Sequence, residues 1–193
     1  MESLGFKDVR TAAAVDAHTL SMSPWLDLMF RDNDFGSRTS TIACACSHYF
    51  LWKHIADEST DLNGRQAALI VEDDCVFSES FVRHLDEKSD EINSLPVVFF
   101  GWTRIEGPDV SSDLKQAPEL VPLDKTGYIG GYFCYSLTRE SARALVDCVD
   151  RHGIRHGVDM VIPFYTDLRV YASRPQLAFS PMATVSNGVD SDV

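Results

Sequence analysis

Three consecutive carboxylates, Glu72-Asp73-Asp74, are the residues of this chain whose types and spacing suggest chemistry most directly. They follow a short apolar run, residues 67–71, which is typical of a buried β-strand. Grouped carboxylates repel one another, and burying them without a partner costs free energy. Their oxygen atoms suit Mg²⁺ or Mn²⁺, which also bind water and phosphate oxygens. We therefore expect a divalent cation here, offsetting charge on a leaving diphosphate.

A simpler interpretation of the same residues is an acidic turn that leads from a strand into a helix. Asp73 or Asp74 would then cap the next helix or lie near its positive end. Pairs of aspartates are common in proteins, so the pattern alone leaves both interpretations open. The buried strand before Glu72 favours the functional one.

The elements that must position these carboxylates alternate between strand-like and helix-like segments. This alternation favours an α/β fold with a mainly parallel sheet and flanking helices. In such a sheet, ligands bind outside the carboxyl ends of the strands, where the triplet falls. Residues 103–126 lack either pattern and predict a long loop. The expected strands are 7–15, 67–71, 96–100 and 128–137, and the expected helices are 40–58, 78–92 and 138–151.

Length and composition predict one globular domain spanning residues 1–193. The formal charge of −12 argues against nucleic acid, which requires a basic surface. No apolar run has the roughly 18 residues of a membrane span, and the first residues lack the pattern of a signal peptide. The five cysteines suit free thiols in a reducing compartment. These features predict a cytoplasmic location, and they leave the oligomeric state open.

Several ordered motifs resemble glycosyltransferase family 25, which includes lipooligosaccharide and procollagen galactosyltransferases and viral members. Residues 44–52, Cys-Ala-Cys-Ser-His-Tyr-Phe-Leu-Trp, resemble the family's Cys-Ala-Leu-Ser-His helix. Residues 71–75 resemble its Leu-Glu-Asp-Asp-Val segment at a similar spacing. Weaker matches occur at residues 10–17, 131–142, 158–159 and 191–193. The family usually begins with a Val-Ile-Asn-Leu-x-x-Arg strand, and this sequence starts after that point. We therefore expect either a trimmed chain or a differently built nucleotide pocket.

The resemblance implies a GT-A-type fold and transfer, with inversion, of a sugar from a nucleotide-diphosphate donor, most often UDP-linked. The acceptor would be a hydroxyl of a glycan or a glycoprotein, and the cofactor Mn²⁺ or Mg²⁺. One alternative is a non-catalytic sugar- or partner-binding module of the same fold. A metal-dependent phosphoryl-transfer enzyme ranks last, because the chain has no P-loop pattern.

The resemblance and the charges also suggest roles for individual residues. Asp74 would be the main metal ligand with Glu72, and Asp73 or Glu72 would assist at the donor ribose or the metal's waters. Asp159 would be the base that deprotonates the acceptor, and Asp192 a second candidate.

Three further residues are expected at the donor: Ser47, His48 and Trp102. For His48, Trp102 and Asp159 a purely structural role is the alternative. His48 would be a structural histidine on a helix face, and Trp102 a core residue. Asp159 would be the N-cap of a helix through residues 160–162.

Overall fold

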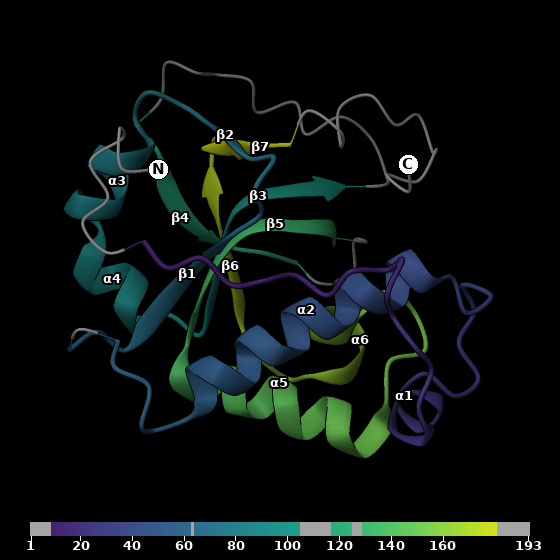
Figure 1. The fold of residues 1–193 in the computed structure, drawn as a ribbon. Coiled ribbons are helices and arrows are strands. Elements are labelled where there is room, and N and C mark those ends of the chain that lie inside the picture. Colours follow the sequence, from purple (N-terminus) through teal and green to yellow (C-terminus); the bar gives the residue numbers. More distant parts are fainter. Residues whose placement is uncertain (1–8, 63, 105–116, 125–128, 181–193) are drawn as a thin grey trace. The chain divides into compact units, whose positions relative to one another are not determined.

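The structure is a computed structural model that describes residues 9–62, 64–104, 117–124 and 129–180 (Figure 1). The chain divides into two compact units. One contains the strands and comprises Met1–Arg10, Leu62–Thr138 and Leu168–Val193. The other is helical where it is described and comprises Thr11–Asp61 and Arg139–Asp167. The prediction of a single glycosyltransferase domain stays a prediction.

The strand-containing unit is built on a five-stranded sheet with the order β1-β5-β3-β6-β4. A second, two-stranded sheet pairs β2 with β7. Two short helices, α3 (Phe81–Glu87) and α4 (Ser89–Ser94), follow β2. The strands are β1 (Ala67–Val71), β2 (Val76–Phe77), β3 (Val97–Arg104), β4 (Glu119–Pro122), β5 (Ile129–Thr138), β6 (Val170–Arg174) and β7 (Ala178–Phe179).

The expectation of a mainly parallel sheet is wrong. Among the described strands of this sheet, only β3 and β6 pair in parallel, whereas β1–β5, β5–β3 and β4–β6 are antiparallel. The apolar run that indicated a parallel strand, β1, lies at the edge of the sheet, and only Ile70 in it is buried. A continuous apolar run carries no information on the direction of its strand, and here it did not predict the extent of burial either. The mixed α/β class itself is confirmed.

The centre of this unit is the antiparallel pair β3–β5, packed with side chains from α3 and α4. Gly101 allows the closest approach in this core, where the pairing of β3 with β5 is irregular on both sides of it. A Cβ at Gly101 would overlap the ring of Phe133 and would lie 2.7 Å from the carbonyl oxygen of Ala178. A glycine is therefore required for β3 to pack here.

The helical unit contains α1 (Pro24–Met29), α2 (Thr39–Ala56), α5 (Arg139–His152), the 3₁₀-helix η2 (Val158–Met160) and α6 (Val161–Tyr165). The two long helices, α2 and α5, pack against each other. Both were predicted, α2 from its apolar periodicity and α5 from the capping signal at Thr138. The predicted stripe of α2 is buried: Ile42, Ala45, Tyr49, Trp52 and Ile55. No described helix combines the length and the apolar character that crossing a membrane would need.

Three expectations about local structure need correction. Residues 9–15 form no strand, although their small apolar residues resembled one. The expected loop 103–126 contains the end of β3 and all of β4, because pairing with β6 stabilises a strand that has little apolar character of its own. The expected helix 78–92 is two helices, separated at Lys88.

Candidate functional site

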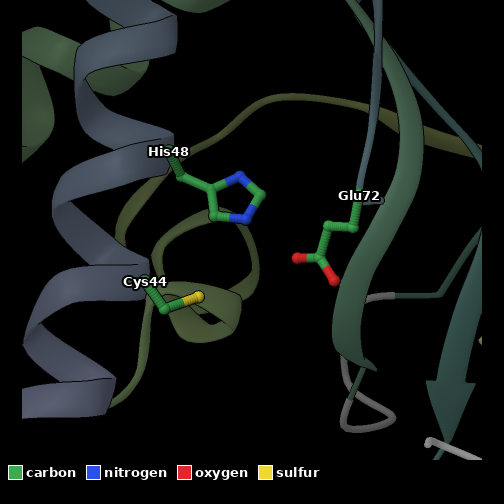
Figure 2. A group of neighbouring side chains, drawn as sticks. All are labelled: Cys44, His48 and Glu72. Atoms are coloured by element: carbon green, nitrogen blue, oxygen red, sulfur yellow. The ribbon is translucent and has the colours of Figure 1, made fainter. Parts of the chain in front are cut away.

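The acidic triplet lies in a tight turn between β1 and β2 (Figure 1). The backbone amide of Cys75 donates to the carbonyl of Glu72 at 3.3 Å, which closes the turn. Asp73 is exposed, whereas Glu72 and Asp74 are partly buried. The Glu72 side chain leaves the backbone just after β1 (Figure 2). The prediction that the carboxylates directly follow a strand is therefore confirmed. The element after them, however, is a short strand and not a helix.

One carbonyl of the neighbouring strand holds both ends of this turn. The Phe133 oxygen on β5 accepts the amide of Glu72 at 2.9 Å and the thiol of Cys75 at 3.0 Å. Burial, and then the charges of Asp74 and Glu72, raises the pKa of the Cys75 thiol to about 12. Cys75 therefore stays protonated near neutral pH and remains a hydrogen-bond donor. The turn is consequently fixed to the centre of the sheet.

Asp74 has two oxygens with different surroundings. Its Oδ2 accepts a hydrogen bond from the hydroxyl of Ser180 at 2.5 Å, and Ser180 is only 5% exposed. Its Oδ1 is buried and has no hydrogen-bond partner among the described residues. Buried acceptors nearly always have a donor or a cation as partner. An ionised carboxylate offers only lone pairs, so Asp74 fits a hard cation at Oδ1.

Ser180 was not predicted from the sequence. It lies 106 positions after Asp74 and reaches it because β7 pairs with β2, the strand that follows the triplet. No local sequence pattern predicts a role for Ser180. Only the pairing of β2 with β7, two strands of two residues each, brings it to Asp74.

Ser47 and His48 lie on α2, together with Cys44 one turn earlier. Cys44 and His48 project from the same side of this helix (Figure 2). The Ser47 hydroxyl donates to the carbonyl of Ala43 at 2.8 Å and accepts the amide of Val15 at 2.9 Å. Ser47 therefore attaches the segment before α1 to α2, and this contact joins two of the family-like motifs. His48 is 4% exposed. The donor-binding roles of Ser47 and His48 stay predictions.

Trp102 lies near the end of β3 and is 3% exposed. Its backbone carbonyl accepts a hydrogen bond from the Gln176 side chain at 3.0 Å. This burial favours the core alternative, and the expected contact with the donor stays a prediction.

The two candidate bases differ in what the structure describes of them. Asp159 is the middle residue of η2 and is partly buried. The N-caps of η2 and α6 are Gly157 and Met160, so the alternative that Asp159 caps this helix is wrong. Asp192 lies outside the described residues. Glu72, Asp73 and Asp74 are brought together by one turn of the strand-containing unit, whereas Asp159 belongs to the helical unit.

Comparison with known proteins identifies the family of this chain. Residues 38–162 match the model of glycosyltransferase family 25 (LPS biosynthesis protein), and the chain belongs to this family.

Three relatives illustrate the range of the similarity. A putative glycosyltransferase of Acanthamoeba polyphaga mimivirus is 31% identical over 141 residues, which cover 69% of this chain and 42% of the viral protein. Procollagen galactosyltransferase 2 of Mus musculus is 26% identical over 213 aligned positions, which cover 96% of this chain and 32% of the mouse protein. The human protein of the same name is 25% identical over 213 aligned positions, which again cover 96% of this chain and 32% of the relative. The chain thus spans less than half the length of these relatives.

Proposed function

We propose that this protein transfers a sugar from a nucleotide-diphosphate donor, with UDP as the nucleotide, to a hydroxyl of a glycan or glycoprotein. Family membership and the printed names of the relatives support sugar transfer. The single observation that supports a donor site at the triplet is the Asp74 carboxylate: one oxygen accepts a hydrogen bond from Ser180, and the other is buried with no donor among the described residues.

Each carboxylate of the triplet has a separate role in this proposal. Asp74 and Glu72 hold Mn²⁺ or Mg²⁺, and the exposed Asp73 accepts hydrogen bonds from the donor ribose. When bound, the cation would supply positive charge close to the departing diphosphate in a chain whose net charge is −12. Ser47, His48 and Trp102 contribute to the donor pocket.

The transfer itself needs a base for the acceptor. The acceptor oxygen attacks the anomeric carbon opposite the diphosphate, the bond from that carbon to the phosphate oxygen breaks, and the configuration inverts. The hydroxyl proton passes to a carboxylate within hydrogen-bond reach. Asp159 is our first candidate for this carboxylate, and Asp192 is the second.

Asp159→Asn tests the base. A positioned general base contributes about 10²- to 10⁴-fold to the rate. We expect the variant to lose sugar transfer by at least about 100-fold, while UDP binding with Mn²⁺ is unchanged. The matched control is Asp147→Asn, an exposed aspartate of the same unit.

The readout is UDP release with an acceptor panel, together with calorimetric UDP binding. Full transfer by Asp159→Asn excludes it as the base and leaves Asp192. Nucleotide binding by wild type without transfer to any acceptor supports the non-catalytic module instead.

A further inference from the structure

We propose that a pocket between α1 and the carboxyl end of α5, wholly inside the helical unit, binds an anionic saccharide, meaning a sugar that carries a carboxylate or a phosphate. The pocket has a volume of about 250 Å³. Two kinds of side chain line it. Trp25 and Leu28 come from α1, and Arg31, Arg151 and Arg155 lie just after α1 and at or after the end of α5.

The three arginines give this pocket a charge opposite to that of the whole chain, which is −12. All three are exposed, and within the described ranges no carboxylate forms an ion pair with them. Asp150, the acidic residue of the lining, accepts a hydrogen bond from the Tyr49 hydroxyl at 2.6 Å. The Nε of Arg151 donates to the carbonyl oxygen of Asp147 at 2.9 Å. The remaining guanidinium donors can bind a carboxylate or a phosphate in a bidentate manner. The charge therefore selects an anion.

The exposed apolar side chains of Trp25 and Leu28 favour a ligand that has an apolar surface as well as a charge. Trp25 is 43% exposed and Leu28 is 59% exposed, although both side chains are large and apolar. The Trp25 ring lies 6.1 Å from Phe50 and 5.8 Å from Tyr49 between ring centroids, so its orientation is supported from α2. An indole held in this way offers a flat apolar face to the C–H groups of a sugar ring. A sugar with one acidic group matches both kinds of side chain.

The choice of a saccharide rests on the proposed function, whereas the preference for an anion rests on the arginines alone. Binding at this pocket needs neither the metal nor the nucleotide. A binding test without both therefore separates this proposal from the donor site.

Tryptophan fluorescence provides the readout, because Trp25 is exposed whereas Trp52 and Trp102 are 0% and 3% exposed. The full chain in EDTA, without nucleotide, is titrated with glucuronate, glucose 6-phosphate, glucose and inorganic phosphate. We expect saturable protection of Trp25 from acrylamide with the two anionic sugars. Glucose and inorganic phosphate should each bind at least about tenfold more weakly, since each lacks one of the two contacts. Asp74→Asn should bind the anionic sugars as wild type does.

Arg155→Gln and Arg31→Gln should each weaken binding of glucose 6-phosphate about tenfold, the loss expected for one charge-assisted contact. Arg83→Gln, an exposed arginine of α3 paired with Glu87, is the control and should bind normally. Unchanged thermal midpoints would show that the exposed arginines were replaced without unfolding. Equal binding of glucose, equal binding of inorganic phosphate, or no binding by wild type would each overturn the proposal. Tighter binding of an acidic peptide than of either sugar would also overturn it.

Discussion

Ser180 is the residue that gives the Asp74 carboxylate a defined orientation. Its hydroxyl donates to Oδ2 and leaves Oδ1 available, so in the proposed metal site this hydrogen bond would determine which oxygen faces the cation. Groups that orient a metal ligand typically change metal affinity 10- to 100-fold when removed.

We predict that Ser180→Ala weakens Mn²⁺ binding about tenfold in a calorimetric titration, and that Ser180→Thr restores most of it. Ser94→Ala removes an exposed serine hydroxyl at the end of α4 and serves as the control. Equal Mn²⁺ affinity in wild type and Ser180→Ala would show that this hydrogen bond has no role in orienting Asp74.

Gly101 gives a second prediction at the residue scale. In Gly101→Ala the new methyl group meets the Phe133 ring and the Ala178 carbonyl, neither of which can move without disturbing the core. Overpacking of this kind costs about 1–3 kcal/mol in the free energy of unfolding. Gly157→Ala is the control, because a Cβ there meets no atom within 4 Å. Urea unfolding compares the two variants, and equal stability would contradict the close packing described for β3.

At the scale of elements, α3 is attached to the core partly through a buried histidine. His84 is 3% exposed, and its Nε2 has no hydrogen-bond partner among the described residues. Burial, aided by the charge of Lys88, lowers the pKa of His84 below 6.5, while Glu87 and Glu91 oppose this shift. The folded state therefore favours the neutral imidazole.

This lowered pKa predicts a loss of stability in mild acid. Above pH 6.5 His84 is neutral in both states, and its contribution is complete. As the pH falls below 6.5 and through the lower folded-state pKa, the unfolded chain binds a proton that the folded chain does not, so the free energy of unfolding decreases. The slope from this group is at most about 1.4 kcal/mol per pH unit.

Urea unfolding between pH 7 and pH 5 measures this effect by comparing wild type with His84→Leu. We expect a shallower pH dependence in the variant, whereas His18→Gln, which replaces an exposed histidine, should follow wild type. Identical slopes for wild type and His84→Leu would exclude His84 as a source of acid sensitivity.

The helices and strands differ in how well they could be predicted from the sequence. The two long helices were predictable because their apolar residues recur every three or four positions, and β1, β3 and β5 because they are apolar runs. β4 was missed because it has only four residues, of which Glu119 and Pro122 are exposed. The predicted direction of the strands was wrong, because direction depends on long-range pairing that the local sequence pattern does not contain.

At the scale of the whole molecule, the sequence indicated the triplet as a candidate site but not the contacts that hold it. The Phe133 carbonyl on β5 and the hydroxyl of Ser180, just after β7, belong to residues more than 50 positions along the chain, and only folding brings them to the turn. The order of the motifs was sufficient to predict the family, and the match over residues 38–162 confirms this prediction. The division of the chain into two compact units was not evident from composition, and the single glycosyltransferase domain stays a prediction.

The central claim is that Asp74 holds a divalent cation that in turn holds the diphosphate of a nucleotide sugar. Thermal unfolding with UDP, with Mn²⁺ or EDTA, tests it most directly in wild type, Asp74→Asn and the control Asp86→Asn, which replaces an exposed aspartate of α3. A ligand at 100 times its Kd adds about 2.7 kcal/mol, and each kcal/mol moves the midpoint by about 2–4 °C in a chain of this size. We predict a rise of about 5–10 °C with UDP and Mn²⁺ in wild type and in Asp86→Asn, and no rise in EDTA or in Asp74→Asn. An equal rise in Asp74→Asn, or the same rise in EDTA, would contradict the claim.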